Sequence, residues 1–413
     1  MDAKILNQIL EIAFQKKVSD LHFEVANPPF FRGRGQLIRS KLPELTPEDT
    51  EFIATTVLEH NGRKLTSELK ELDASYSLPT GGRFRVSIFR QRGNLGIIMR
   101  VIPPHIGTLR ELNLPAVLSE IVKAPNGLIL VTGPTGNGKS TTLASMIRLL
   151  NESQNYNIIT IEDPIEFLFK SEKSCIIQRE VGIDTVDFNA ALKAALRMDP
   201  DVIMVGELRD KETIDSCIKA AETGHLVFST LHTQSAVSTI NRLLGAFPPD
   251  GQEIVRQRLA DILVAVVSLR LIKDKTGENI FPVVEIMRST TTIQACIREG
   301  RLEEIEKHIE NGQSMYQMQT LDQHLLQLFK QDIISMEDAK RLSHSMDLER
   351  KLMFVNCKTH FMKKPLAIFT TLFTICLVIF STWQLFKGNL EAAFMPLPFL
   401  IITYLYLQSA KKP

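Results

Sequence analysis

The sequence is sparing with cysteine and has no excess of either charge. Its five cysteines form no CxxC pair and no cluster with histidine at metal-ligand spacing; they are Cys175, Cys217, Cys296, Cys357 and Cys376. This arrangement excludes a disulfide framework and a zinc module, and it suits a reducing compartment. Lys and Arg number 48 against 47 Asp and Glu, a net charge of +1, which argues against nucleic acid as the main partner.

The N-terminus lacks the layout of a secretory signal peptide. Acidic residues interrupt the apolar positions of MDAKILNQILEIAFQKK at helical spacing. We therefore expect the body of the protein to be cytoplasmic. With 413 residues, 44% of them hydrophobic, the chain is long enough for two or three ordinary domains.

The first part of the chain predicts a small domain and a linker. Residues 1–102 combine an amphipathic helix with short β-like runs, such as DLHFEV (20–25) and FRVSIF (84–89), and predict an α+β domain. Residues 103–115 contain three prolines and a glycine, which favour an extended linker over a helix.

The second part, residues 116–350, predicts an α/β domain. Four apolar runs, at 127–132, 157–161, 202–206 and 225–230, alternate with helix-like segments. Buried parallel strands joined by crossover helices have this pattern. From about residue 255 the pattern becomes largely helical.

A phosphate-binding loop begins where the first of these runs ends. GPTGNGKS satisfies G-x-x-x-x-G-K-[ST], and a helical apolar pattern follows it. In such a loop the backbone amides wrap phosphates, Lys139 reaches the outer phosphates and the Ser140 hydroxyl coordinates Mg²⁺. A glycine-rich turn without a ligand is the alternative, and the strand, loop and helix context argues against it. The residues predicted to bind ATP here are Gly133, Pro134, Thr135, Gly136, Asn137, Gly138, Lys139, Ser140 and Thr141.

Acidic residues follow two other apolar runs. Glu162, Asp163 and Glu166 come after 157–161, and Glu207 comes after 202–206. The carboxyl ends of parallel strands beside a phosphate loop face the bound nucleotide, where a carboxylate holds the Mg²⁺ water shell or orients the attacking water. A solvated loop residue or a helix cap is the alternative for any one of them.

Two histidines lie at the ends of the fourth apolar run. His225 and His232 are seven residues apart, which does not match a local metal pair. Each is a packing or hydrogen-bonding residue or, alternatively, a contact of the nucleotide site.

These motifs together resemble the type II/type IV secretion ATPase superfamily. LRMDPDVIMVGELRD (196–210) is similar to its signature, IEDPIEF to its acidic box, GHLVFSTLHT to its histidine box and SDLHFEVANPPFFRGRG to the opening of its N-terminal domain. Within the superfamily the sequence is most similar to the PilT-type pilus retraction ATPases, over residues 4–350.

The resemblance implies a fold, a function and roles. It implies a PAS-like N-terminal domain and a RecA-like ATPase domain, assembled as a homohexamer that hydrolyses ATP with Mg²⁺ and acts on an inner-membrane pilus platform protein. It implies that Glu166 is the general base and that Glu207 is the second carboxylate and, with Ser140, a metal ligand. The other residues that it places around the nucleotide are Glu162, Asp163, His225, His232, Arg197, Arg242, Arg83, Arg85 and Arg92.

Departures from the family pattern narrow the expected function. The chain has neither the additional N-terminal domain nor the four-cysteine zinc module typical of extension and secretion motors, which favours pilus retraction and twitching motility. The segment TTIQACIREGR (291–301) changes the AIRNLIRE-like sequence of the main retraction motors and is closer to the accessory, PilU-type ATPases. The alternatives are an accessory or scaffold subunit for a paralogous pilus ATPase, and a secretion or DNA-uptake ATPase of the same superfamily.

The tail predicts a membrane hairpin at 363–412. Residues 365–386 carry no charged side chain, and a second uncharged run covers 392–410. A spanning helix needs roughly 20 apolar residues, and Trp383 and the flanking lysines lie where interfacial anchors belong. We therefore expect the tail to anchor the ATPase at the inner face of the bacterial plasma membrane, with both ends cytoplasmic. An apolar hairpin buried in the soluble body and an amphipathic surface helix are the alternatives.

Overall fold

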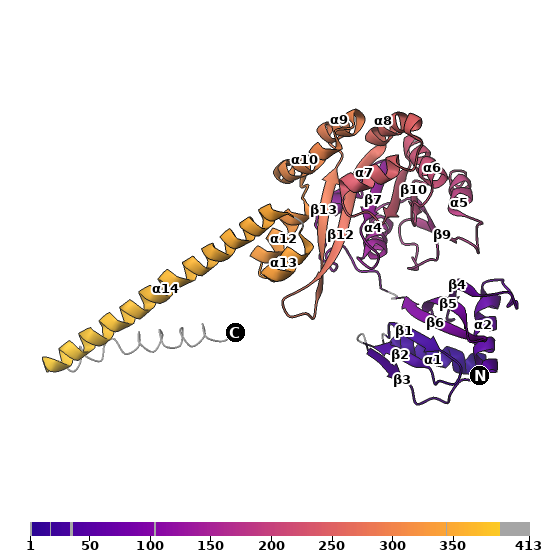
Figure 1. Cartoon of the computed structure of the whole chain (residues 1–413), viewed down its shortest axis with the longest axis horizontal. Coiled ribbons are helices and arrows are strands. Elements are labelled where there is room, and N and C mark those ends of the chain that lie inside the picture. The colour runs from indigo at the N-terminus through magenta and orange to yellow at the C-terminus, as the bar shows by residue number, and fades with distance from the viewer. Residues whose placement is uncertain (1, 17, 34–35, 103–104, 344, 389–413) are drawn as a thin grey trace. The chain divides into compact units, whose positions relative to one another are not determined.

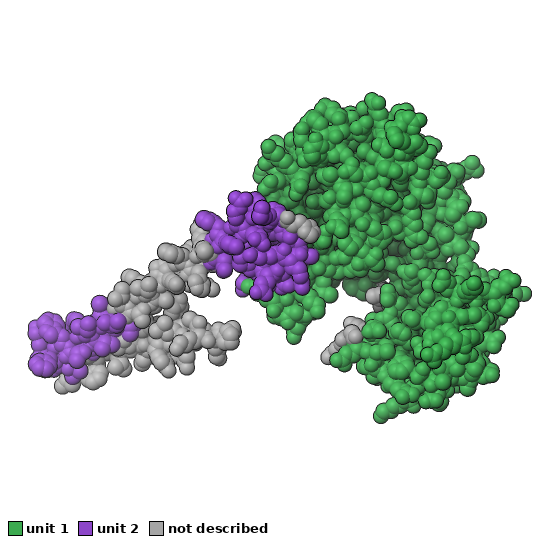
Figure 2. All heavy atoms as spheres, in the orientation of Figure 1, with its two compact units in different colours: residues 1–324 green, residues 325–413 purple. Residues whose placement is uncertain are grey.

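The computed structural model describes residues 2–16, 18–33, 36–102, 105–343 and 345–388, with side chains for all of these except 357–372. The chain divides into two compact units, residues 1–324 and residues 325–413 (Figure 2). Within the described residues, the first unit contains two β-sheets, one of six strands and one of seven (Figure 1).

The first sheet is antiparallel throughout, in the order β3-β2-β1-β6-β5-β4. Its strands are β1 (Asp20–Phe23), β2 (Phe30–Gly33), β3 (Gln36–Arg39), β4 (Glu71–Ser77), β5 (Arg83–Gln91) and β6 (Asn94–Ile102). Helices α1 (Ala3–Gln15) and α2 (Pro47–His60) bury their apolar faces in the same core as Phe23 and Phe84. The helix and the two strands predicted for this region are confirmed.

The second sheet has the order β13-β12-β7-β11-β10-β8-β9. Its strands are β7 (Gly127–Thr132), β8 (Asn157–Glu162), β9 (Cys175–Glu180), β10 (Val202–Val205), β11 (Leu226–Leu231), β12 (Leu263–Lys273) and β13 (Ile280–Arg288). All neighbours are parallel except β12 and β13, which pair antiparallel. The four predicted parallel strands are confirmed as β7, β8, β10 and β11.

The predicted helical pattern from residue 255 is wrong for the β12–β13 hairpin. The β12 sequence, LVAVVSLRLIK, is a continuous apolar run rich in valine, and such a run cannot be assigned to helix or strand by periodicity alone. Its β-branched side chains and its position beside buried β7 decide in favour of a strand.

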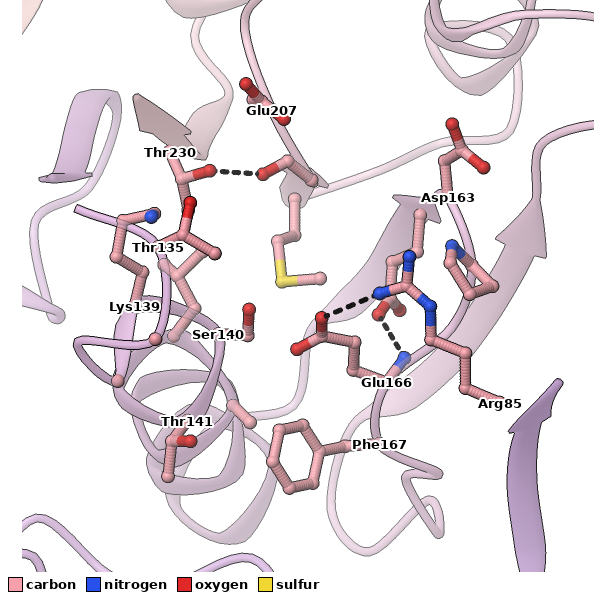
Figure 3. A pocket seen from close by; sticks show the side chains of 18 of the residues that line it. Arg85, Thr135, Lys139, Ser140, Thr141, Asp163, Glu166, Phe167, Glu207 and Thr230 are labelled. Atoms are coloured by element: carbon pink, nitrogen blue, oxygen red, sulfur yellow. Dashed lines mark hydrogen bonds and ion pairs between the residues drawn. The ribbon is translucent and has the colours of Figure 1, made fainter. Parts of the chain in front are cut away.

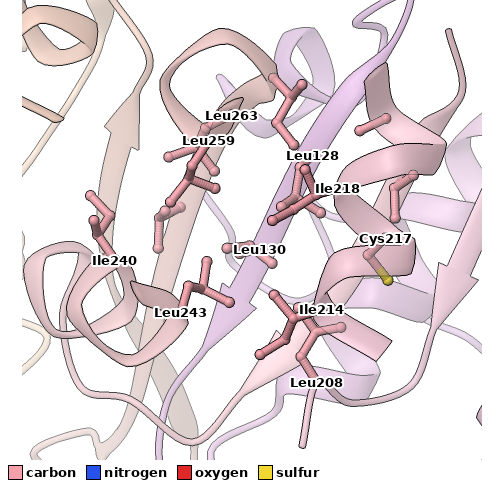
Figure 4. Close-up of a cluster of buried hydrophobic side chains, with 14 of the residues drawn as sticks. Leu128, Leu130, Leu208, Ile214, Cys217, Ile218, Ile240, Leu243, Leu259 and Leu263 are labelled. Atoms are coloured by element: carbon pink, nitrogen blue, oxygen red, sulfur yellow. The ribbon is translucent and has the colours of Figure 1, made fainter. Parts of the chain in front are cut away.

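Helices cover both faces of the second sheet. Neighbouring side chains along β7 point to opposite faces, so they enter two separate cores. Leu128 and Leu130 pack in one core with α6 (Lys211–Glu222), α7 (Ala236–Leu244) and α8 (Gln252–Ile262), as Figure 4 shows. Ile129 and Val131 pack in the other core with α3 (Leu118–Ile121) and α4 (Lys139–Ser153). The remaining helical segments of this unit are α5 (Phe188–Ala195), η1 (Pro249–Gly251), α9 (Thr291–Glu299), η2 (Leu302–Glu304), α10 (Ile305–Asn311) and α11 (Gln313–Tyr316).

Most of the longer helices of the first unit begin at a residue whose side chain accepts a backbone hydrogen bond from the first turn. These capping residues are Asp2, Thr46, Asp187, Asp210, Ser235 and Thr290. A cap of this kind satisfies an amide that has no partner inside the helix. Helix α4 differs, because Gly138 precedes it and no side chain caps it.

The second unit contains α13 (Met336–Leu342) and α14 (Met346–Phe386), and α12 (Leu321–Lys330) contains the boundary between the units. Helix α14 has 41 residues, begins after Ser345 and is continuous through Lys363, where the sequence had predicted a new element. No helix in the described part of the chain is long and apolar enough to cross a membrane. The predicted membrane hairpin at 363–412 is therefore not supported there, and its second run, 392–410, lies outside the described residues.

Candidate functional site

The phosphate loop joins the end of β7 to the start of α4. Gly133 has a φ of +143°, and a Cβ at this position would lie 2.4 Å from the Leu269 carbonyl oxygen of β12. Only glycine fits this combination of backbone conformation and close approach. The Asn137 side chain then fixes the loop by accepting a hydrogen bond of 2.9 Å from the Leu271 amide. The uncapped amides of α4 are thereby presented at one edge of the sheet, as an anion-binding site requires.

Lys139 lies at the mouth of this loop with little exposure to solvent. Its ammonium group donates hydrogen bonds to the carbonyl oxygens of Gly133 at 2.8 Å and Pro134 at 3.3 Å. Burial lowers the pKa of Lys139, whereas the negative charges of Glu207 and Glu166 act in the opposite direction. The residue is thus a cation close to two carboxylates, at the place where phosphate charge would need neutralisation.

Glu207, which follows β10, is held by two basic side chains. His232 Nε2 lies 3.2 Å from one carboxylate oxygen of Glu207, and Arg209 Nε lies 2.9 Å from the other. His232 Nδ1 also lies 3.3 Å from the Lys139 ammonium and 3.4 Å from the Thr135 hydroxyl. The histidine therefore connects the end of β11 to both the phosphate loop and the carboxylate.

Glu166 lies on the loop after β8 and is held through its backbone. Its amide donates to Glu162 Oε2 at 3.3 Å, and Glu162 also accepts hydrogen bonds from Thr160 and Gln178. Burial raises the pKa of the Glu162 carboxyl, and these hydrogen bonds act against that shift. The Glu166 side chain itself is 40% exposed and lies 3.9 Å from Arg85 of the first sheet.

These groups face one cavity of about 660 Å³ (Figure 3). The predicted site residues that line it are Arg85, Thr135, Gly136, Gly138, Lys139, Ser140, Thr141, Glu162, Asp163, Glu166, Glu207 and His232. Figure 3 shows Ser140 between Lys139 and Glu166, with Glu207 on the side of Thr230. The Ser140 hydroxyl and the carboxylates that line the same cavity offer oxygen ligands, which Mg²⁺ prefers.

Several predicted site residues do not line this cavity. Gly133, Pro134 and Asn137 belong to the loop but contact Lys139 or β12. His225 precedes β11 at the opposite end from His232, where its Nδ1 lies 2.9 Å from the Ala220 carbonyl oxygen. Arg92, Arg197 and Arg242 are exposed outside the cavity.

Arg83 has a different partner from the one expected. Its guanidinium forms a 2.5 Å ion pair with Glu180, the last residue of β9, and it does not line the cavity.

Several residues that line the cavity were not predicted from the sequence. Arg209 lies only two positions after Glu207 in the GELRD segment, and Thr230 lies within the histidine box, so both were within motifs already identified. Arg100 pairs in register with Arg85 across the β5–β6 hairpin, a relation that hairpin pairing could have suggested. The apolar lining includes Phe167, the last residue of IEDPIEF, and also Phe169 and Phe188, for which no local signal exists.

Relatives match over most of the chain. The sequence model of the family described as "Type II/IV secretion system protein" matches residues 2–356. The twitching motility protein of Neisseria gonorrhoeae is 43% identical over 319 residues, which cover 77% of this chain and 85% of that protein. The type IV pilus retraction ATPase PilT of Pseudomonas aeruginosa is 42% identical over 335 residues, which cover 81% of this chain and 97% of that protein.

A solved structure agrees with these sequence matches. The crystal structure of the pilus retraction motor PilT with bound ADP has a TM-score of 0.75 and 42% identity, over 83% of this chain and 97% of that chain. The family resemblance predicted from the motifs is confirmed.

Proposed function

Because the chain belongs to the type II/IV secretion system protein family, we propose that it is an ATPase motor that powers retraction of a type IV pilus. The observation that carries the catalytic part is the convergence of Lys139, Glu166 and Glu207 on one cavity at the phosphate loop. These residues come from three different elements, so the sequence motifs alone did not require them to meet.

ATP binds with its phosphates on the loop 133–138 and on the amides of α4. Lys139 exchanges its carbonyl partners for the outer phosphates. Ser140 and Glu207 would hold Mg²⁺ or its water shell, and the ion would supply charge neutralisation and polarisation of the phosphoryl oxygens. Arg85 and Arg100 enter the same cavity from the first sheet and are the additional cations on this side.

Glu166 is better suited than Glu207 to orient the attacking water. The Glu207 carboxylate is 21% exposed and is occupied by His232 and Arg209, whereas the Glu166 side chain is 40% exposed. A general base must be free to accept a hydrogen bond from water. We therefore assign Glu166 as the base, Glu207 as the second carboxylate and His232 as the residue that senses the phosphate end of the nucleotide.

Hydrolysis is converted into movement between two domains. We assign 1–102 as the N-terminal domain, 103–115 as the linker and 116–350 as the ATPase domain with its C-terminal helices. Arg85 and Arg100 link the state of the nucleotide to the first sheet, and the linker acts as the hinge. Six copies form a ring at the cytoplasmic side of the pilus machine, where a platform protein receives the motion.

The alternative function is that of an accessory subunit for a second pilus ATPase. The altered segment 291–301, which forms α9, is the observation in its favour. The test compares ATP turnover of the chain alone with turnover in the presence of the partner motor. Turnover that appears only with the partner supports the accessory role.

Substitution at the cavity tests the catalytic assignment. Lys139→Ala and Glu166→Gln abolish phosphate release, because the first removes the phosphate cation and the second removes the base. Glu172→Gln is the matched control, since Glu172 is exposed on the same β8–β9 connection and does not line the cavity. Wild-type turnover in Glu166→Gln contradicts the assignment of the base, and wild-type turnover in Lys139→Ala contradicts the site.

A further inference from the structure

Glu180 is a buried carboxylate that the catalytic assignment does not use. Its side chain is 4% exposed, and it ends β9 at the edge of the second sheet. It receives hydrogen bonds from Arg83 at 2.5 Å, from the Ser75 hydroxyl at 3.2 Å and from the Ile165 amide at 3.2 Å. A buried charge of this kind is stable only when its partners satisfy it, so loss of one partner is costly.

The partners of Glu180 come from two different parts of the first unit. Ser75 and Arg83 belong to β4 and β5 of the first sheet, and Arg83 also donates to Ser75 at 3.1 Å. Ile165 immediately precedes Glu166 on the loop after β8. One carboxylate therefore binds the first sheet and the backbone amide of Ile165, the residue before the one assigned as the base.

The rest of the Glu166 loop is fixed by side chains of the second sheet. Gln178, on β9, donates to the Phe167 carbonyl at 2.8 Å and accepts from the Phe169 amide at 2.9 Å. Because Glu162 holds the Glu166 amide, this side of the loop is held by the second sheet alone. Among these contacts, only the one through Glu180 continues into the first sheet.

The Glu180–Arg83 ion pair also affects the position of Arg85. Arg83 and Arg85 are two residues apart on β5, so their side chains leave the same face of the strand. Arg83 bonds to Glu180, while Arg85 lines the cavity 3.9 Å from Glu166. An ion pair that holds Arg83 in place therefore also holds this part of β5, and with it Arg85, at its distance from Glu166.

We propose that Glu180 and Arg83 are positioning residues that hold Glu166 and Arg85 in register across the nucleotide cavity. This inference rests on the proposed role of Glu166 as the base. The pair does not line the cavity and acts through the Ile165 amide on one side and through β5 on the other. Its effect is on the rate of hydrolysis rather than on the affinity for nucleotide, because the phosphate loop has its own supports on β12.

The test measures ATP turnover, affinity for a fluorescent ADP analogue and thermal unfolding of the full chain. Glu180→Gln and Arg83→Gln should lower kcat roughly ten- to a hundredfold, since misplacement of about 1 Å costs this much. Affinity for the ADP analogue should stay within about threefold of the wild type. The double variant should be no slower than the slower single variant, because coupled residues are not additive. Arg83→Lys, which keeps the charge, should recover part of kcat.

Glu222→Gln is the matched control. Glu222 pairs with Arg258 at 2.7 Å, also as a carboxylate with an arginine, but neither residue lines the cavity. This variant should lower the unfolding temperature and leave kcat unchanged. If Glu180→Gln does not fold, Ser75→Ala and Arg83→Gln, which keep the carboxylate, carry the test.

Two results would overturn the proposal. One is wild-type kcat in folded Glu180→Gln or Arg83→Gln, and the other is a loss of kcat matched by an equal loss of ADP affinity. ATP turnover of Glu166→Gln shows whether the positioning role or the assignment of the base has failed. An inactive Glu166→Gln beside a fully active Glu180→Gln refutes only the positioning role.

Discussion

Glu285 on β13 is a buried carboxyl group that is connected by hydrogen bonds to the end of β7, where the phosphate loop begins. It accepts hydrogen bonds from the Ala236 amide at the start of α7 and from the Ser268 hydroxyl, which in turn accepts from Thr132 at the end of β7. Burial raises the pKa of Glu285 to about 7. Its charge therefore changes near neutral pH, next to the elements that present the phosphate loop and His232.

The sign of this shift predicts how stability depends on pH. Because the folded state holds the proton up to about pH 7, whereas the ordinary pKa of this carboxyl is 4.5, stability falls as the pH rises from about 4.5 to 7. Glu285→Gln cannot ionise, so it should be more stable than the wild type by a few kcal/mol above pH 7, with the difference shrinking toward pH 5. Thermal unfolding at several pH values measures this. A difference that is the same at all pH values would refute it.

Residues with a local sequence signal were predictable, and residues defined by a distant partner were not. Lys139, Ser140, Glu166 and Glu207 each stand in a short motif after an apolar run, and all four line the cavity. Arg83 was expected at the nucleotide together with Arg85 and Arg92, three of the four arginines in GRFRVSIFRQR (82–92), because no local pattern distinguishes among them. Its ion pair with Glu180 joins positions 97 apart in sequence, which no local pattern encodes.

At the scale of elements, the phosphate loop depends on β12, a strand whose sequence predicted a helix. Leu269 supplies the carbonyl that approaches Gly133, and the Leu271 amide fixes Asn137. The apolar run at 263–273 carried no periodicity that separates a buried strand from a buried helix. The sequence features that favour a strand here are the valine content of 263–273 and the turn residues at 274–279.

Gly133→Ala tests this dependence. A side chain at φ +143° and 2.4 Å from a carbonyl oxygen costs roughly 1–3 kcal/mol or displaces the loop, so affinity for an ADP analogue should fall about tenfold or more. Gly277→Ala is the control, because Gly277 also has positive φ, in the β12–β13 turn, but no atom lies within 4 Å of the added Cβ. Equal ADP affinity in the two variants would contradict the account of the loop.

At the scale of the whole molecule, the sequence motifs predicted the α/β architecture and the family, both of which the sheet topology and the relatives support. The family resemblance placed Arg85 at the nucleotide, but the motifs did not predict Arg100 or the Glu180–Arg83 pair, because these contacts join segments far apart in sequence. The match to the family ends at residue 356, so the tail beyond it has no counterpart in that comparison.

The most direct measurement of the central claim is pilus retraction in cells whose only copy of the gene carries Glu166→Gln. Surface pili and twitching motility are scored beside the wild type and Glu172→Gln, with protein amounts matched by immunoblot. The account predicts that Glu166→Gln cells keep or accumulate surface pili but do not twitch, while Glu172→Gln cells behave as the wild type. Normal twitching in Glu166→Gln cells would contradict the claim that ATP hydrolysis at this cavity powers retraction.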